Sequence, residues 1–175
     1  AAHMGAKVLA IANQKGGVGK TTTSITLSSA LARMGKRILV LDLDPHACAT
    51  LHARIYPEGI TCSLHDLFLA QEEEWPAIWP ELIHKGALPG VDVAPGSIRL
   101  SELEVDFRER QAKGSVLLRS IAHVRDTYDY IILDCPPHVG ILLVNALVAS
   151  DLLIIPIQTD FLALHGLKLL FDTLH

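Results

Sequence analysis

The stretch NQKGGVGKTT, Asn13 to Thr22, constrains the fold of this chain more than any other feature. An apolar run, VLAIA, precedes it, and a helical pattern, TTTSITLSSALA, follows it. A glycine-rich turn between a buried strand and a helix lets backbone N–H groups and the helix N-terminus surround an anion. The order of strand, glycine-rich turn and helix therefore predicts a phosphate-binding site near the start of the chain.

The second half of this stretch matches the pattern G-x-x-x-x-G-K-[ST], but Gln14 stands where the first glycine belongs. Lys20 is expected to reach the β and γ phosphates of a nucleotide, and Thr21 to place its hydroxyl on Mg²⁺. The pattern leaves a second lysine, Lys15, unexplained. The remaining positions expected to bind the nucleotide are Gly16, Gly17, Val18, Gly19 and Thr22.

Two further segments supply carboxylates. The run RILVLDLDP ends in Asp42 and Asp44, and the run YDYIILDCPP ends in Asp134. Because ligands of open α/β sheets bind at the carboxyl ends of the strands, these acids are expected to lie beside the phosphate loop. Asp134 is expected to hold Mg²⁺ through its water shell, with an N-cap of the next helix as the alternative. For Asp42 that alternative carries equal weight.

Apolar, β-branched runs alternate with helical patterns, which predicts an α/β fold with a mainly parallel sheet. Several runs are apolar without alternation, as is typical of strands covered on both faces. The predicted strands are 7–12, 37–43, 91–94, 130–133 and 152–157. The predicted helices are 21–34, 64–70, 100–110, 116–126, 141–149 and the residues from 162 onward.

Length and composition fit one domain. Half of the 175 residues are hydrophobic, so we expect a single domain over residues 1–175, with 1–3 as a cloning remnant. The net charge of -4 argues against a strongly basic nucleic-acid binder. No run reaches the roughly 18 apolar residues of a membrane span and no signal peptide is visible, so a cytoplasmic location is expected. The chain stops inside a helical pattern, which predicts that the C-terminal part of the domain is missing.

Two residue types raise separate questions. The three cysteines, Cys48, Cys62 and Cys135, lack C-x-x-C spacing and are expected to be small buried thiols, not disulfides or zinc ligands. The segment EEEWPAIWP, residues 72–80, is expected to form a peripheral insert with a short helix. For its two tryptophans, packing against the body is favoured over a partner site.

Together these segments resemble the ParA/MinD group of ATPases. KGGVGKTT is similar to the deviant Walker A motif of this group, and LDLDPHACAT is similar to the ParA switch I pattern D-x-D-P-Q-x-x-x-T. The segment that starts at YDYIILDCPPHVG resembles the Walker B motif, switch II and the helix that follows. The resemblance covers nearly the whole chain and implies a three-layer α/β/α P-loop NTPase with ATP and Mg²⁺ as ligands.

The resemblance also implies roles for single residues. ATP binding in this group joins two subunits face to face, so Lys15 is expected to contact the nucleotide of the partner subunit, and a side chain at Gly16 or Gly17 to obstruct the dimer. Asp44 is implied to orient the attacking water. The implied catalytic residues are Lys15, Lys20 and Asp44, and the implied metal ligands are Thr21, Asp44 and Asp134.

The implied function is a slow, partner-stimulated ATPase that positions or segregates DNA or protein cargo. The implied partners are a second copy of the chain and a ParB-like stimulating protein. Non-specific DNA binding, and with it association with the nucleoid, stays open, because acids dilute the basic cluster and a solvated helix face explains it equally well. The cluster comprises Arg108, Arg110, Lys113, Arg119 and Arg125.

Two alternatives share the deviant loop. One is a metabolic ATP-dependent enzyme similar to cobyrinic acid diamide synthase; the related iron proteins of nitrogenase are disfavoured because Cys135 lacks a suitable second cysteine. The other is a MinD-like membrane switch, which needs a C-terminal amphipathic helix and is disfavoured by the proline of switch I.

The chain departs from the usual switch residues at three positions. His46 replaces a glutamine, Cys48 an asparagine and His138 a serine. The resulting DPH, with SLHDLF and PIQTDFLALHGL, is similar to the ParA-like proteins that position chemotaxis arrays at the cell pole. The resemblance assigns no role to the three residues.

Overall fold

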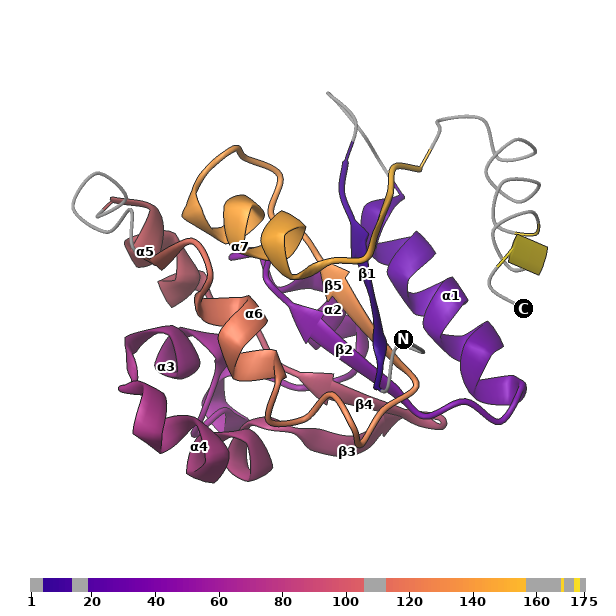
Figure 1. Cartoon of the computed structure of the whole chain (residues 1–175), viewed down its shortest axis with the longest axis horizontal. Coiled ribbons are helices and arrows are strands. Elements are labelled where there is room, and N and C mark those ends of the chain that lie inside the picture. The colour runs from indigo at the N-terminus through magenta and orange to yellow at the C-terminus, as the bar shows by residue number, and fades with distance from the viewer. Residues whose placement is uncertain (1–4, 14–18, 106–112, 157–167, 169–171, 174–175) are drawn as a thin grey trace.

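The structure is a computed structural model that describes residues 5–13, 19–105, 113–156, 168 and 172–173. Within this part of the chain, six strands form one sheet in the order β3-β4-β2-β5-β1-β6 (Figure 1). β3 runs antiparallel to β4 at the sheet edge, and the other strands are parallel. The strands are β1 (Lys7–Ile11), β2 (Ile38–Asp42), β3 (His84–Leu88), β4 (Val91–Ala94), β5 (Tyr130–Asp134) and β6 (Leu152–Ile154).

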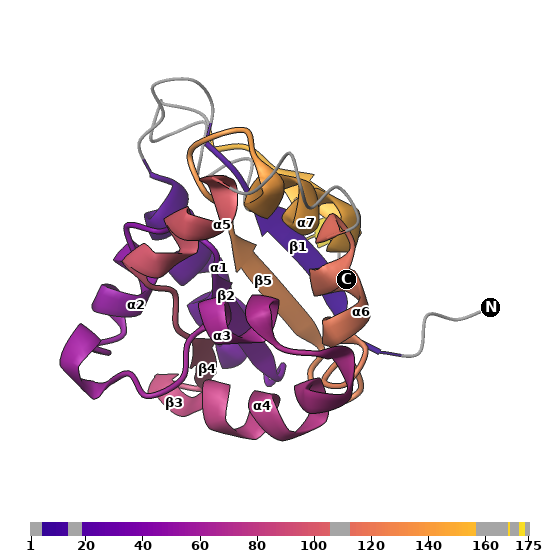
Figure 2. The same ribbon diagram turned by 90° about the vertical axis from the view of Figure 1, so that its left-hand side faces the viewer.

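Helices cover both faces of this sheet, so the predicted three-layer α/β/α architecture is confirmed. Helix α1 packs on one face, and α3 to α7 pack on the other, as the two views show (Figures 1 and 2). The α-helices are α1 (Lys20–Arg33), α2 (Cys48–His52), α3 (Leu64–Leu69), α4 (Trp75–Leu82), α5 (Ser101–Val105), α6 (Val116–Ile121) and α7 (Ile141–Ala149). Short 3₁₀ helices are η1 (Pro57–Gly59), η2 (Glu72–Glu74) and η3 (Ile98–Leu100).

Side chains of the central strands alternate between two hydrophobic cores. In β1, Val8 and Ala10 join the core under α3 to α7, whereas Leu9 and Ile11 join the core under α1. Since helices cover both faces, every one of these positions is apolar and the sequence shows no alternation. In the described residues no helix has the length and apolar content needed to span a membrane.

All five predicted strands are present, and the helices predicted at 21–34, 64–70 and 141–149 match within a residue at each end. The helix predicted at 116–126 ends at Ile121 and continues as turns, and the one predicted at 100–110 starts as η3 and α5. Residues 106–112 and most residues from 162 onward lie outside the described part. One strand and one α-helix were missed: β3 is a partly exposed edge strand, and α2 is only five residues long, so neither has a clear hydrophobic period.

The tryptophan insert packs against the body, as favoured. Trp75 and Trp79 are each 2% exposed. The indole N–H of Trp75 donates to the carbonyl of Leu67 at 3.1 Å, and that of Trp79 donates to the carbonyl of Ser120 at 2.9 Å. Because both polar atoms are satisfied inside the fold, these residues are structural and not part of an exposed partner surface.

Helix α7 begins against a carboxylate from another helix. Glu104 of α5 accepts hydrogen bonds from the backbone N–H groups of Ile141 at 2.8 Å and Leu142 at 3.4 Å. These are N–H groups that a helix cannot satisfy by itself. A Cβ built on Gly140 would overlap the Glu104 carboxylate, whereas the φ of Gly140, -167°, suits any residue. A side chain at position 140 would therefore displace the carboxylate of Glu104, a partly exposed residue, from the start of α7.

The cysteines divide by exposure. Burial raises the pKa of Cys135 to about 12 and that of Cys62 to about 11. Cys48 is exposed, so the expectation that all three thiols are buried is wrong for this residue, which lies on the short helix α2 at the surface. Burial and the charges of Asp44 and Asp42 raise the pKa of Cys48 as well, so its exposure is what distinguishes it. We expect a disulfide reagent at pH 8 to modify Cys48 in the native protein and the other two only after denaturation. Fast modification in the native protein that persists in Cys48→Ser would contradict this.

The contact of Glu104 with Gly140 can be tested by a double-mutant cycle. Gly140→Ala is expected to destabilise the fold by about 1 kcal/mol, because the new methyl group displaces the carboxylate that accepts from the first turn of α7. In the Glu104→Ala background, which itself loses about 1 kcal/mol of capping, the same substitution should cost much less. Urea unfolding measures both free energies. Equal costs of Gly140→Ala in the two backgrounds would show that the overlap does not govern this position.

Candidate nucleotide site

The site starts at the N-terminus of α1. Gly19 has a φ of 98°, a conformation that side chains disfavour, and nothing lies within 4 Å of a Cβ built there. Glycine is therefore required by the backbone angle alone. Lys20 and Thr21 begin the helix, and Thr22 is exposed. Lys15, Gly16, Gly17 and Val18 lie outside the described residues, so the predictions made for them stay predictions.

The ammonium group of Lys20 lies between two of the predicted acids. Its Nζ is 2.8 Å from Oδ1 of Asp134 and 3.3 Å from Oδ2 of Asp44, and the lysine side chain is 4% exposed. The acids come from the carboxyl ends of two adjacent parallel strands, because β2 pairs with β5 in register, with Asp42 opposite Asp134. The sheet edge thus brings together residues separated by up to 114 positions, as the sequence predicted.

Asp134 also accepts hydrogen bonds from hydroxyl groups on α1. The Oγ1 of Thr21 donates to its Oδ2 at 3.2 Å, and the Oγ of Ser24 donates to its Oδ1 at 3.0 Å. The N-cap alternative for Asp134 is wrong, because α7 begins at Ile141 with Gly140 as its N-cap. Ser24 was not predicted; its only signal is its place one helical turn after Lys20.

Burial and charge act against each other on the pair of Lys20 and Asp134. Burial lowers the pKa of Lys20, but Asp134, Asp44 and Asp42 outweigh it and raise that pKa overall. Burial raises the pKa of Asp134 more than the contacts with Lys20, Ser24 and Thr21 lower it. The raised pKa of Lys20 favours a charged ammonium group, whereas the raised pKa of Asp134 favours a neutral carboxyl group. With three donors on one carboxylate, hydrogen bonding favours the ionised pair.

Asp42 anchors the turn that follows β2, residues 44–50, which we call the switch I turn. Its Oδ2 accepts from the backbone N–H of Thr50 at 2.9 Å and from the Thr50 hydroxyl at 2.7 Å, and its Oδ1 accepts from the N–H of Asp44 at 3.2 Å. Burial, then the charge of Asp134, raises the pKa of Asp42 to about 7. The N-cap residue of α2 is Ala47. Asp42 is therefore not the N-cap, and it fixes the turn through its hydrogen bonds to Thr50 and Asp44.

Asp44 is held from its other side by His46. Oδ1 of Asp44 lies 2.9 Å from both the backbone N–H and the ring Nδ1 of His46, which leaves Oδ2 for Lys20. Sequence reasoning gave His46 no role, yet the histidine takes part in positioning the acid. A glutamine also carries a side-chain donor, so the substitution keeps that chemistry.

The donor set fits Mg²⁺, an ion that binds oxygen ligands and usually keeps several waters and substrate phosphates in its shell. Two carboxylates, Asp44 and Asp134, and the hydroxyl of Thr21 converge beside one cation, Lys20. Two acids, Asp44 and Asp134, contact a single lysine, and Asp42 lies behind them with its pKa raised to about 7. Two carboxylates against one ammonium group suit a second positive charge at this edge.

The basic cluster is partly engaged within the fold. Arg119 pairs with Glu72 at 2.9 Å and lies over the Trp75 ring at 5.6 Å from its centroid. Arg125 donates to the carbonyl of Ala6 and pairs with Asp151 at 3.0 Å. Arg108 and Arg110 lie outside the described residues. For Arg119 and Arg125 the structure favours a structural role over a phosphate track.

Comparison with known proteins gives consistent matches. A family model described as "AAA domain" matches residues 6–175. The sporulation initiation inhibitor protein Soj of Bacillus subtilis is 39% identical over 167 residues, which are 95% of this chain and 64% of Soj. The chromosome partitioning protein ParA of Caulobacter vibrioides is 38% identical over 170 residues, 96% of this chain and 62% of ParA. The chain thus spans less than two thirds of the length of these relatives.

Solved structures agree with these matches. A cobyrinic acid a,c-diamide synthase from Mycobacterium smegmatis, with bound ATP analog and magnesium, has a TM-score of 0.78 at 34% identity, over 96% of this chain and 66% of that one. Apo McdA from Cyanothece has a TM-score of 0.75 at 24% identity, over 96% and 66%, and shares the fold. With its lysine and carboxylates gathered at the sheet edge, the chain belongs to the ParA/MinD-like family of P-loop ATPases.

Proposed function

We propose that this protein is a ParA-like switch that binds ATP with Mg²⁺, pairs with a second copy as an ATP sandwich and hydrolyses ATP to ADP and phosphate. The observation that carries the proposal is the Lys20 ammonium held between Asp134 and Asp44 at the carboxyl edge of the sheet. A lysine held by carboxylates there is pre-positioned to exchange them for phosphate groups. The name of the chromosome partitioning protein ParA, a relative at 38% identity, supports chromosome partitioning as the setting.

Lys20 and the acids act by changing partners. When the triphosphate enters, Lys20 turns from Asp134 and Asp44 to the β and γ phosphate oxygens. In the complex, Asp44 and Thr21 would hold Mg²⁺ through their oxygens, and Asp134 would hold it through its water shell. The ion would supply positive charge beside the phosphates as the bond between the γ phosphorus and the β-phosphate oxygen breaks.

Asp44 orients the attacking water. Its Oδ1 is fixed by His46, and its backbone N–H is fixed by Asp42, so its Oδ2 has a defined direction. Phosphoryl transfer through a loose transition state depends on position and electrostatics more than on a strong base, so a fixed carboxylate suffices. The proton of the water passes to the phosphate or to Asp44 as the γ phosphorus accepts the new oxygen.

Lys15 completes the site from the other subunit. Charge on the γ phosphoryl oxygens needs more cations than Lys20 and Mg²⁺ supply, and a lysine that arrives with the partner makes hydrolysis depend on dimerisation. In the cytoplasm such a switch positions DNA or protein cargo, with a ParB-like protein as its stimulating partner. Association with the nucleoid needs non-specific DNA binding by the ATP dimer.

A second candidate is a metabolic enzyme that uses ATP to make an amide. The similarity to the cobyrinic acid a,c-diamide synthase, at 34% identity, favours it. The D-x-D-P pattern of the switch I turn favours the ParA-like proposal. The two candidates differ in their coupling: the enzyme hydrolyses ATP in step with amidation of a carboxylate, whereas the switch hydrolyses it with no second substrate.

Lysine substitutions test the ATP sandwich. With ATP and Mg²⁺ the protein is expected to run as a dimer in size-exclusion chromatography with light scattering, and Lys20→Ala to stay monomeric because it cannot bind the phosphates. Lys15→Ala, the matched control in the same loop, should bind ATP but hydrolyse it more slowly, by on the order of 10²-fold. Circular dichroism checks the fold of both. Monomers at every ATP concentration would refute the sandwich.

Substitution of Asp44 separates binding from hydrolysis. Asp44→Asn keeps the size of the side chain and is expected to lower the hydrolysis rate by on the order of 10²-fold, because the water loses its orienting carboxylate. The affinity for a fluorescent ATP analogue should change less than the rate. Asp129→Asn, at a surface pair with Arg37 far from the edge, is the control. Unchanged hydrolysis in Asp44→Asn would remove this residue from the mechanism.

A further inference from the structure

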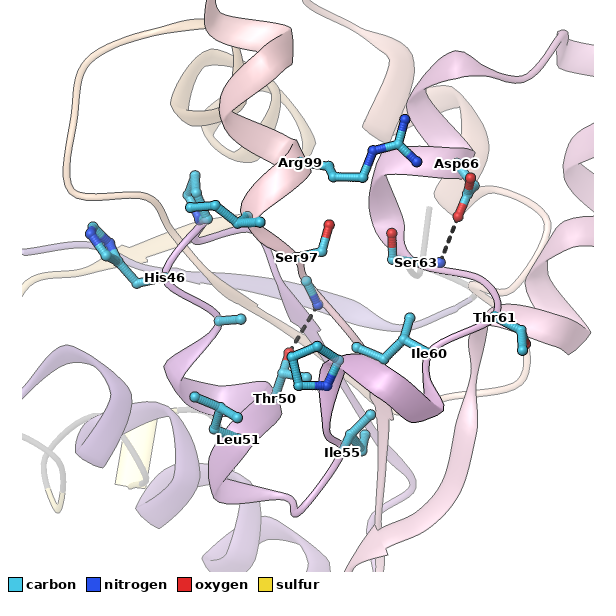
Figure 3. A pocket seen from close by; sticks show the side chains of 15 residues that line it. His46, Thr50, Leu51, Ile55, Ile60, Thr61, Ser63, Asp66, Ser97 and Arg99 are labelled. Carbon is cyan, nitrogen blue, oxygen red and sulfur yellow. Dashed lines mark hydrogen bonds between the residues drawn. The ribbon is translucent and has the colours of Figure 1, made fainter.

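A pocket of about 560 Å³ lies beside the switch I turn, apart from the phosphate site. Its walls come from the switch I turn and α2, from the segment that follows α2 together with the first turn of α3, and from the loop after β4 together with η3 (Figure 3). Lys20, Thr21 and Asp134 do not line it. This size falls in the range of about 300–1,000 Å³ typical of small-molecule sites.

The two sides of the pocket differ in chemistry. One side is aliphatic, from Leu51, Ile55 and Ile60, as Figure 3 shows. The other side carries Ser97, Asp66 and Arg99. An occupant that suits both sides has a branched aliphatic body and a polar head.

The polar side offers one hydroxyl without a partner and two charged groups that the fold uses only in part. The Ser97 hydroxyl is buried and has no hydrogen-bond partner among the described residues, an arrangement that costs about 1–3 kcal/mol. Arg99 forms an exposed ion pair with Glu102, with 3.8 Å between Nε and Oε1, and the arginine side chain is 60% exposed. Asp66 uses its Oδ2 to accept from the backbone N–H of Ser63 at 2.8 Å. A cation and an anion on one wall favour a zwitterionic head over a singly charged one.

The pocket wall is bonded to the carboxylates of the nucleotide site. The backbone N–H of Gly96 donates to the Thr50 hydroxyl at 2.9 Å, and that hydroxyl donates to Asp42, which binds the N–H of Asp44. A Cβ built on Gly96 would overlap the carbonyl oxygen of Asp42, so the two segments are in direct backbone contact. An occupant that shifts this wall therefore shifts the switch I turn.

The switch I turn also carries backbone strain where it lines the pocket. Ala47 has a φ of 54°, in the left-handed region that residues other than glycine rarely adopt. Strain of this kind costs on the order of 1–3 kcal/mol and makes a segment sensitive to what packs on it. Ligand contacts at Ala47 and Leu51 would stabilise one arrangement of the turn over others.

We propose that this pocket binds a free branched-chain amino acid, with its carboxylate on Arg99 and Ser97, its ammonium on Asp66, and its aliphatic side chain on Leu51, Ile55 and Ile60. The bound amino acid changes the affinity for ATP through Gly96, Thr50 and Asp42. Only this coupling rests on the proposed function, since binding in the pocket needs no nucleotide.

Equilibrium dialysis with radiolabelled L-leucine, without nucleotide, tests the pocket. Saturable binding at millimolar concentrations is expected, and 4-methylpentanoate and isoamylamine, which each lack one charge, should compete at least about tenfold less well. Arg99→Gln and Asp66→Asn should each weaken binding about tenfold, and Asn keeps an acceptor for Ser63. Arg33→Gln, an exposed arginine on α1, should not. No saturable binding, or equal binding by all variants, would overturn the assignment.

Coupling is tested by titrating a fluorescent ATP analogue with and without saturating L-leucine. Linkage requires L-leucine to change the affinity for ATP by the same factor by which ATP changes the affinity for L-leucine. A factor of at least about five is expected, and Thr50→Val, which loses the hydroxyl, should reduce it toward one. If L-leucine binds but the factor is one in the wild type, the regulatory part is wrong. If ATP itself fails to bind, the proposed function fails and the pocket result stands alone.

Discussion

The ion pair between Lys20 and Asp134 sets the arrangement of the rest of the site. It joins the first turn of α1 to the end of β5, and the second contact of Lys20 with Asp44 adds the turn after β2. A buried charge without partners would cost several kcal/mol, so the three segments are held together by the need to neutralise one another. The sheet supplies the positions, because parallel strands present their carboxyl ends at one edge.

Much of the fold and site followed from the sequence for a physical reason. Central strands covered on both faces are continuous apolar runs. The sequence therefore predicted the strands Lys7–Ile11, Ile38–Asp42 and Tyr130–Asp134, together with the acids Asp42 and Asp134 that end two of them. The sequence did not predict the edge strand His84–Leu88 or the short helix Cys48–His52. Both form through contacts with neighbouring segments, which the order of polar and apolar residues does not reveal.

The residues that position the acids were harder to find than the acids themselves. Ser24, His46 and Thr50 act through hydrogen bonds to Asp134, Asp44 and Asp42. Serine, histidine and threonine in helices and turns are common, and only the folded arrangement distinguishes these from other copies. The sequence predicts charged groups that a reaction needs more readily than the neutral groups that hold them in place.

The close approach of Glu104 to Gly140 has a consequence for how this chain can vary. One residue lies on α5 and the other begins α7, so neither position can be judged alone. A library that randomises Gly140 while Glu104 is kept would favour glycine, and the same library built on alanine at 104 would favour it less. The two positions are 36 residues apart in the sequence, yet the residue that one tolerates depends on the other. A change on α5 therefore alters which residues are tolerated at the start of α7.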